Sequence, residues 1–299
     1  MRLESFAQWL ALAEERQVPL WRIVLEYEMH QKGRSEAEIW ARLAQVLAVM
    51  RDAVQTGLTE PRQTPSGLVR DSGKKLAQAP FHILSPQFTR LLAYAMAAKE
   101  TNACMGRVVA APTAGASGIL PGIYTFLAEE HQVPERTLYE CMLIGAGVAL
   151  IIEQKASIAG AVGGCQAETG TAAAMGAAGL VYAFGGTPAQ IGEAVALTIM
   201  NMLGLICDPV AGLVELPCVK RNGSAVVIAA AAAQMALAGD TAVIPVDELI
   251  VAMGEVGAAM DPRFKETGMG GTAATPTAQA IARRLWTDPA ALRYEDPPE

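Results

Sequence analysis

Apolar runs dominated by alanine alternate with short glycine-rich segments from about Gln87 to Ala282. Alanine has the highest intrinsic helix propensity and loses no side-chain entropy in a helix, so such runs favour closely packed helices. The chain is 52% hydrophobic and only 5% aromatic, so its core has to be built largely from small and aliphatic side chains. We therefore predict an all-α fold.

The glycine-rich segments between these runs are where we expect a functional site. Glycine lets a backbone adopt positive φ and approach a ligand closely, and binding residues concentrate in loops held by a rigid scaffold. We call these segments the Gly-rich joints; they are Pro112–Gly118, Gly160–Gly170, Gly204–Gly223 and Lys265–Thr272. The predicted architecture is an Ala- and Gly-rich helical domain whose joints form the site.

The amino-terminal part of the chain predicts three further helices, because apolar residues recur there at helical spacing. Ser35 followed by Glu38 predicts a capping box at the start of the third helix. A stretch rich in proline and glycine follows, Thr59 to Pro86, and is equally compatible with a linker and a long surface loop. We expect a helical segment at residues 1–65 and a main domain at residues 66–299. The apolar positions are Phe6, Leu10 and Ala13, then Leu20, Val24 and Tyr27, then Ile39, Leu43, Val46 and Met50.

Composition excludes several classes of function. The net charge is −7 and no long basic run occurs, unlike the electrostatic signature of a nucleic-acid-binding protein. The first fifteen residues develop no apolar core of a secretory signal. The most membrane-like stretch, Gly223–Gly239, is short and carries Gln234, so it predicts a buried core helix rather than a membrane span. We expect a cytoplasmic protein whose cysteines are reduced thiols or metal ligands.

Three of the five cysteines fall in the Gly-rich joints, namely Cys165, Cys207 and Cys218. The other two, Cys104 and Cys141, lie in apolar helical stretches and are interpreted as small buried hydrophobic residues. No paired C-x-x-C spacing of a zinc ribbon is present. Spacing alone leaves open a three-cysteine cluster and a pair of zinc ligands with a bystander. If three thiolates held an iron–sulfur cubane, one iron would lack a protein ligand and act as a Lewis acid.

Four segments of the chain resemble the iron–sulfur-dependent L-serine dehydratases, in their α subunit or α-type domain. They are RVVAAPTAGASGILPG, EQKASIAGAVGGCQAETGTAAAMGAAGLV, NMLGLICDPVAGLVELPCVKRN and DPRFKETGMGGTA. The resemblance covers roughly Ser66 to Ala282. It implies that Cys165, Cys207 and Cys218 hold a [4Fe–4S] cluster, and that residues 66–299 form the catalytic α-type domain. It also implies conversion of L-serine to pyruvate and ammonia without pyridoxal phosphate, within amino-acid catabolism and gluconeogenesis.

The same resemblance implies a partner protein. Members of the family carry a β-type domain either in the same chain or as a separate subunit, and this sequence contains no β-type region. A separate β subunit and a hetero-oligomer are therefore expected. Some single-chain relatives also place a carboxy-terminal cysteine in the site, and no cysteine follows Cys218 here.

The substrate carboxylate needs hydrogen-bond donors, and the joint that contains Thr113, Gly115 and Ser117 opens a predicted helix. Hydroxyls and backbone N–H groups at a helix N-terminus bind anions, so these residues are candidates for substrate binding. A plain helix cap is the alternative for the same residues.

Lys99 and Lys155 lie in otherwise apolar surroundings and are candidates for catalysis. A buried lysine binds a carboxylate or, with its pKa lowered, acts as a base. A lysine that only extends its ammonium group to solvent is the alternative. Lys220, Arg221 and Asn222 follow Cys218, where positive charge suits an anionic cluster. His82 is the one histidine considered as a base, and the general base stays unassigned.

Three other functions remain open from the sequence. A cysteine desulfidase-type lyase would present a thiol instead of a hydroxyl to the open iron. A non-catalytic iron–sulfur sensor or regulatory subunit would need no carboxylate site, and a structural zinc protein would contain no sulfide.

Overall fold

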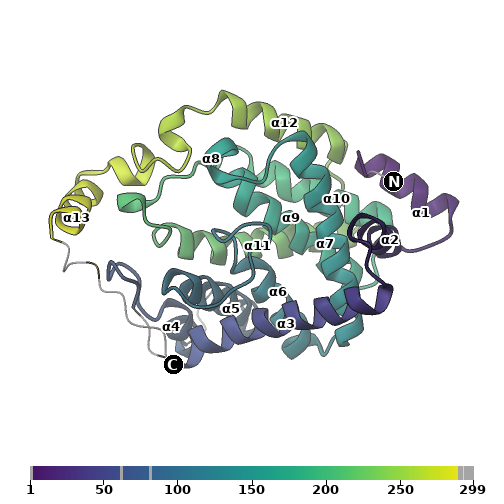
Figure 1. Ribbon diagram of the computed structural model, residues 1–299, viewed down its shortest axis with the longest axis horizontal. Coiled ribbons are helices and arrows are strands. Elements are labelled where there is room, and N and C mark those ends of the chain that lie inside the picture. The colour runs from purple at the N-terminus through teal and green to yellow at the C-terminus, as the bar shows by residue number, and fades with distance from the viewer. Residues whose placement is uncertain (1–2, 61–62, 81–82, 289–291, 293–299) are drawn as a thin grey trace.

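A computed structural model gives the fold and describes residues 3–60, 63–80, 83–288 and 292 (Figure 1). Every regular element in this part of the chain is a helix, and only two isolated β-bridges occur beside them. This confirms the predicted all-α fold.

Helix α9, Thr171–Ala183, runs through the centre of the molecule. Every residue from Thr171 to Val181 is buried. Four helices pack around it, which explains why eight of the thirteen residues of α9 are alanine or glycine. A Cβ on Gly176 would lie 2.2 Å from Cδ1 of Ile123, so only glycine allows one of these helices to approach so closely. The four helices are α6 (Ile119–His131), α7 (Glu135–Lys155), α10 (Pro188–Met202) and α11 (Cys218–Leu237).

The three predicted amino-terminal helices are present as α1 (Phe6–Glu15), α2 (Leu20–Lys32) and α3 (Glu36–Thr59). The predicted capping box is also present: the Ser35 hydroxyl accepts from the Glu38 backbone, whose side chain accepts from the Ser35 N–H. The hydrophobic core is continuous from these helices to the central ones. The predicted division of the chain into a helical segment at residues 1–65 and a main domain at residues 66–299 therefore stays a prediction.

The described part of the proline-rich stretch from Thr59 to Pro86 includes a helix, which neither a linker nor a surface loop predicts. It contains α4 (Ser72–Gln78), which packs on α5 (Pro86–Ala103). The buried Glu100 carboxylate of α5 accepts from the backbone N–H groups of Ser72 and Gly73 at the start of α4. His82 lies outside the described residues.

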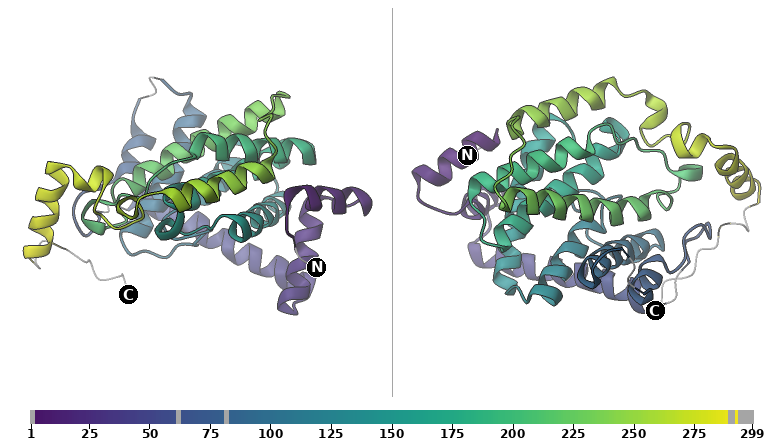
Figure 2. Two further views of the ribbon diagram at one scale, coloured as in Figure 1. Left: turned by 90° about the horizontal axis from the view of Figure 1, so that it is seen from above. Right: turned by 180° about the vertical axis from the view of Figure 1, so that it is seen from behind.

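The carboxy-terminal part of the chain folds back over one edge of the molecule (Figures 1 and 2). Helix α12, Val246–Ala259, is followed by the short 3₁₀ turns η3 (Pro262–Phe264) and η4 (Gly271–Ala274) and by α13 (Pro276–Thr287). Between the two turns the backbone pairs with that of Cys207. The Cys207 N–H donates to the Phe264 carbonyl over 2.8 Å, and the Glu266 N–H donates to the Cys207 carbonyl over 2.8 Å.

Two apolar helices raise the question of a membrane. Helix α7 is long and apolar enough to cross one, yet 56% of its apolar window is buried inside the fold, as in the core helix of a globular protein. Within α11, the predicted core stretch Gly223–Gly239 buries Val226, Ala229 and Ala233 against its neighbours.

Candidate functional site

Cys165 lies between two helices at a sharp turn. The short helix α8, Gly160–Gly163, ends at Gly164, whose φ of 76° lies in the region that favours glycine. Cys165 follows, and then a five-residue π-turn, η1 (Gln166–Gly170), leads directly into α9. Single π-turns inside helices occur frequently at functional sites.

Gln166 connects this turn to the joint that carries Cys207. The Gln166 backbone N–H donates to the Leu205 carbonyl over 2.9 Å, and its side-chain oxygen accepts from the Gly204 N–H over 2.9 Å. Its amide nitrogen donates to the Met253 carbonyl in α12 over 3.0 Å. A single fully buried side chain therefore ties together the segments before Cys207, after Cys165 and in α12.

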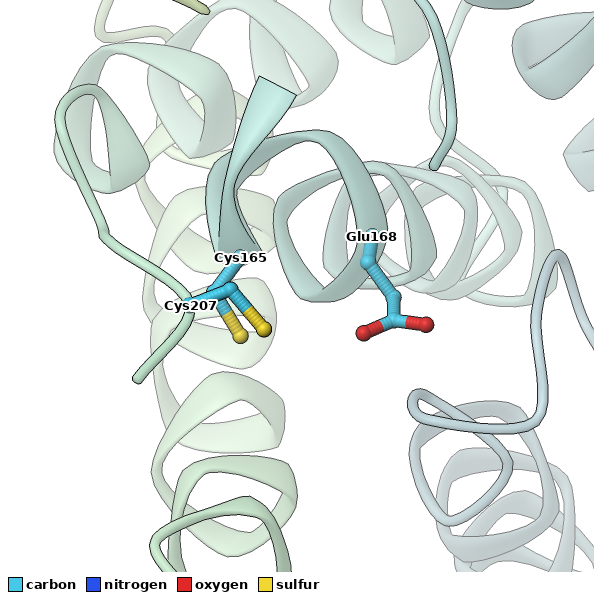
Figure 3. A group of neighbouring side chains, drawn as sticks. All are labelled: Cys165, Glu168 and Cys207. Carbon is cyan, nitrogen blue, oxygen red and sulfur yellow. The ribbon is translucent and has the colours of Figure 1, made fainter. Parts of the chain in front are cut away.

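Cys165, Cys207 and Glu168 form one buried group of metal-ligating side chains. One ligand atom from each lies within 4.8 Å of the other two. Figure 3 shows the two sulfur atoms side by side. The Glu168 carboxylate lies further along the helical segment that follows Cys165, on the same side as the sulfur atoms. The Cys165 sulfur also lies 3.1 Å from the Thr169 hydroxyl.

Cys218 is the third cysteine at this site and the first residue of α11. It lies outside the 4.8 Å group, but it is buried and its charge interacts with those of Cys165 and Lys99. Asn222, one turn later, donates to the carbonyls of Cys218 and Gly115 over 2.9 Å each. Its side-chain oxygen accepts from the Gly118 N–H over 2.9 Å, which fixes the joint that opens α6 against the start of α11.

The thiols differ in how easily they ionise. The hydrogen bond from Cys207 lowers the pKa of Cys165 to about 7, and the same contact followed by burial raises the pKa of Cys207. Burial raises the pKa of Cys218 to about 12, against the attraction of Lys99. In the absence of metal, the Cys165–Cys207 pair thus loses one proton readily and retains the other.

Arg221 and Asp208 hold the joints around the thiols. The Arg221 guanidinium lies 2.6 Å from the Asp208 carboxylate and donates to the Ile206 carbonyl over 2.8 Å. Asp208 also accepts from the backbone N–H of Thr272 over 2.6 Å and from its hydroxyl over 2.5 Å. These contacts connect the residues beside Cys207 with α11 and with η4.

Glu168 is held in place by the joint that contains Thr113. The Thr113 hydroxyl donates to the Glu168 carboxylate. A Cβ on Gly115 would lie 2.4 Å from that carboxylate, so glycine leaves the space that Glu168 occupies. A second acid, Glu266, approaches from the carboxy-terminal segment, and burial raises its pKa, as does the neighbouring Glu168.

Lys99 is the buried lysine of the site. Its side chain is completely buried, and Nζ donates to the Asn102 side-chain oxygen and, over 3.2 Å, to the Ala114 carbonyl. Burial lowers the pKa of Lys99, while the negative charges of Cys218 and Glu168 act in the opposite direction.

A cavity of about 360 Å³ opens beside these groups. Three of its lining residues are acids, Glu168, Glu215 and Glu266, and two of the others are the hydrogen-bond partners of Lys99. The remaining lining residues are Pro65, Ala103, Met105, Gly115, Leu213 and Val214. The cavity is large enough for a small molecule such as an amino acid.

The donor set fits a metal group. Three buried thiols from three chain segments, with a carboxylate beside two of them, are compatible with a metal cluster. By contrast, Cys141 is buried in α7 and its sulfur donates to the Gly179 carbonyl, away from the other thiols, as predicted for a small core residue. Cys104 is half-buried at the end of α5.

The structure brings most of the predicted site residues together, but not all. Thr113, Gly115 and Lys99 lie at the cavity or directly behind its wall. Ser117 is fully buried, and its hydroxyl has no hydrogen-bond partner among the described residues. Lys155 lies elsewhere, with its ammonium 2.9 Å from the Asp247 carboxylate of α12. The catalytic role predicted for Lys155 has no support in these contacts and stays a prediction.

Sequence reasoning missed two acids of the site. Glu168 follows Cys165 by less than one helical turn, a spacing that places both side chains on neighbouring faces, and this signal was available in the sequence. Glu266 is brought to Cys207 only by the backbone pairing of distant segments, for which the sequence contains no local signal.

Comparison with known proteins finds relatives over most of the chain. The family described as "Serine dehydratase alpha chain" matches residues 15–273. The L-serine dehydratase alpha chain of Peptoniphilus asaccharolyticus is 39% identical over 94% of this chain and 97% of its own length. A probable L-serine dehydratase alpha chain of Bacillus subtilis is 41% identical, over 93% of each chain. An L-serine dehydratase of Escherichia coli is 37% identical over 80% of this chain but only 55% of its own length. With this match across most of its length, the chain belongs to the serine dehydratase alpha chain family.

Proposed function

We propose that this chain is the catalytic α subunit of an L-serine dehydratase, which converts L-serine to pyruvate and ammonia with a [4Fe–4S] cluster. Cys165, Cys207 and Cys218 are the proposed ligands. The observation that carries the proposal is the convergence of three buried thiols beside a cavity that contains Glu168 and is backed by Lys99. The family match and the names of the relatives support the substrate and the reaction.

When bound, a cluster held by three thiolates supplies a Lewis-acidic iron that assists departure of the serine hydroxyl. The protein has to supply the rest: removal of the Cα proton, and binding of the carboxylate and the ammonium group. Loss of the proton and of hydroxide leaves an aminoacrylate, which tautomerises to an imine and is hydrolysed to pyruvate and ammonia.

We assign removal of the Cα proton to Lys99. Its Nζ donates two hydrogen bonds, to Asn102 and to Ala114, so a neutral amine satisfies both acceptors and keeps a lone pair. Burial lowers the pKa of Lys99 and thereby favours this neutral form. A base positioned in this way contributes roughly 10²–10⁴-fold to the rate.

We assign binding of the substrate carboxylate to the joint before α6. The buried Ser117 hydroxyl has no partner in the described part of the chain and is available as a donor, together with the backbone N–H of Gly115 at the cavity. Gly115 provides close approach of the backbone to the cavity. The hydroxyl of Thr113 is already donated to Glu168, so Thr113 acts by positioning this acid.

We also propose that the chain works with a separate β subunit. Two relatives that match it nearly end to end are named alpha chains, which implies a second subunit in those enzymes. The longer relative from Escherichia coli carries the matching region in about half of a single chain. A hetero-oligomer of α and β subunits follows from this proposal.

The direct test is anaerobic reconstitution with iron and sulfide, with and without a candidate β subunit, followed by assays of pyruvate and ammonia from L-serine. We expect stoichiometric release of both products. A parallel assay of sulfide released from L-cysteine separates a dehydratase from a desulfidase. Binding of iron and sulfide without turnover of either substrate in the presence of the β subunit would contradict the proposal.

Cysteine variants test the ligand assignment within the same assay. Serine in place of Cys165, Cys207 or Cys218 is expected to abolish activity and reduce bound iron, because each thiolate is a ligand. Cys141→Ser is the matched control, since Cys141 is equally buried but lies among core residues in α7. Full activity and full iron content in Cys218→Ser would refute the assignment of that residue.

A further inference from the structure

Two acids of the cavity converge from distant parts of the chain. Glu168 lies in the π-turn after Cys165, and Glu266 lies between η3 and η4. A Cβ on Gly160 would be 3.3 Å from a Glu168 carboxylate oxygen, 3.4 Å from a Glu266 carboxylate oxygen and 3.5 Å from the Cys207 sulfur. Both carboxylates therefore reach one small region, and both line the cavity.

Neither acid forms an ion pair with a described residue, and the nearby Lys99 interacts with both only at longer range. No lysine or arginine of the described chain lies within ion-pair distance of either one. Lys99 Nζ donates instead to Asn102 and Ala114. Two neighbouring carboxylates, the buried Glu168 and the half-buried Glu266, are unfavourable without an ion-paired cation, so the arrangement favours a cation that arrives with the substrate.

The third acid of the cavity is different. The Glu215 carboxylate accepts hydrogen bonds from the backbone N–H of Ser66, over 3.3 Å, and from the Ser66 hydroxyl. It is already satisfied within the protein. Glu168 has one such donor, Thr113, and the Glu266 carboxylate has no donor among the described residues. Among the acids of the cavity, Glu168 and Glu266 are thus the ones whose carboxylate oxygens still lack hydrogen-bond donors in the described chain.

We propose that Glu168 and Glu266 form the subsite for the substrate's ammonium group and make the site selective for amino acids over the corresponding hydroxy acids. This inference rests on the proposed function. An ammonium group offers three donors and one positive charge, which suits two converging carboxylates. A hydroxy acid offers the same carboxylate but only a neutral hydroxyl at this position, and leaves the two acids without an ion-paired cation.

Two inert ligands test the subsite without depending on turnover. L-alanine retains the ammonium group, L-lactate replaces it by a hydroxyl, and neither carries a leaving group on Cβ. Their dissociation constants are measured by calorimetry on the reconstituted enzyme with its partner subunit. We expect the wild-type protein to bind L-alanine more tightly than L-lactate. Glu168→Gln and Glu266→Gln should each raise the dissociation constant of L-alanine by about 10- to 100-fold, the range for a lost charge-assisted hydrogen bond. The dissociation constant of L-lactate should stay within a few-fold of the wild-type value.

Iron and sulfide are counted in every variant, and Glu215→Gln is the matched control from the same cavity. We expect this control to keep the wild-type ratio of the two dissociation constants. If Glu168→Gln and Glu266→Gln both keep full metal content and the wild-type ratio of the two dissociation constants, the proposed subsite is wrong. Loss of iron in Glu168→Gln would also overturn it, because Glu168 would then be a metal ligand. If the wild-type enzyme forms no pyruvate from L-serine, the proposed function fails, while the two dissociation constants still decide the subsite.

Discussion

Lys99 shows at the residue scale how a fold changes the chemistry of a common side chain. On a surface it would carry a solvated charge, but in α5 it is enclosed and hydrogen-bonded to Asn102 and Ala114. The cost of burying its charge outweighs the attraction of the nearby acids and thiols, so its pKa falls. This lowered pKa supports the proposal that Lys99 acts as the base.

Replacing Lys99 by methionine is predicted to lower kcat by roughly 10²–10⁴-fold, since the general base is lost while the volume is nearly retained. In the wild-type enzyme, kcat/KM should rise with pH as Lys99 loses its proton, and this limb should lie below the ordinary lysine pKa of 10.5. The pH profile of pyruvate formation measures both effects. A residual activity in Lys99→Met with the same rising limb would assign the base to another group.

Gly115→Ala tests the close approach between the joint and Glu168. The new Cβ would lie 2.4 Å from the Glu168 carboxylate, so this acid has to move. Misplacement of a site residue by about 1 Å costs on the order of 10²-fold in rate, and kcat/KM for L-serine should fall by a similar factor. Gly192→Ala is the control, because its Cβ would meet Phe6 at an ordinary 3.5 Å. Equal activity of the two variants would show that the space beside Glu168 is not needed.

At the element scale, the site depends on contacts that fasten helix ends to joints. Gln166 joins the turn after Cys165 to the segment before Cys207, and Asn222 joins the start of α11 to the joint before α6. The thiols are brought together by these contacts rather than by spacing in the sequence.

Asn222→Leu is predicted to weaken the packing of the joint before α6 against the start of α11, where Cys218 lies. It removes the partner of the Gly115 carbonyl and of the Gly118 N–H, and each buried group left unsatisfied costs about 1–3 kcal/mol. Chemical denaturation should show lower stability, and iron should be lost faster to a chelator. Ser224→Ala, an exposed α11 residue whose hydroxyl contacts only the Lys220 carbonyl, is the control. Equal chelation rates in the two variants would contradict the account.

Helices with a strong periodic pattern or a defined cap were predictable from the sequence. The capping box at Ser35, for example, is present at the start of α3. The π-turn at Gln166–Gly170 was not predicted, because the segment was expected to be a Gly-rich joint between helices. Helix α4 was also missed, since its stability comes from packing on α5 and from the Glu100 carboxylate, not from its own short sequence.

For the whole molecule, the sequence singled out three cysteines, and the fold shows their surroundings. Cys165, Cys207 and Cys218 stood out because they lie in glycine-rich joints between apolar helices. Glu266 could not be foreseen, because its place depends on the carboxy-terminal segment folding back onto Cys207. Lys155 looked similar to Lys99 in sequence, yet its partner is Asp247 on α12. Burial and partners, which only the fold determines, distinguish the two lysines.

The central claim is that Cys165, Cys207 and Cys218 hold a four-iron cluster in which one iron remains open to L-serine. Mössbauer spectroscopy of the protein reconstituted with ⁵⁷Fe, before and after addition of L-serine, tests this directly. Our account predicts a cubane spectrum in which the signal of one iron site in four shifts with the substrate and the others stay unchanged. A spectrum without a cubane, or a cubane in which no iron responds to L-serine, would contradict it.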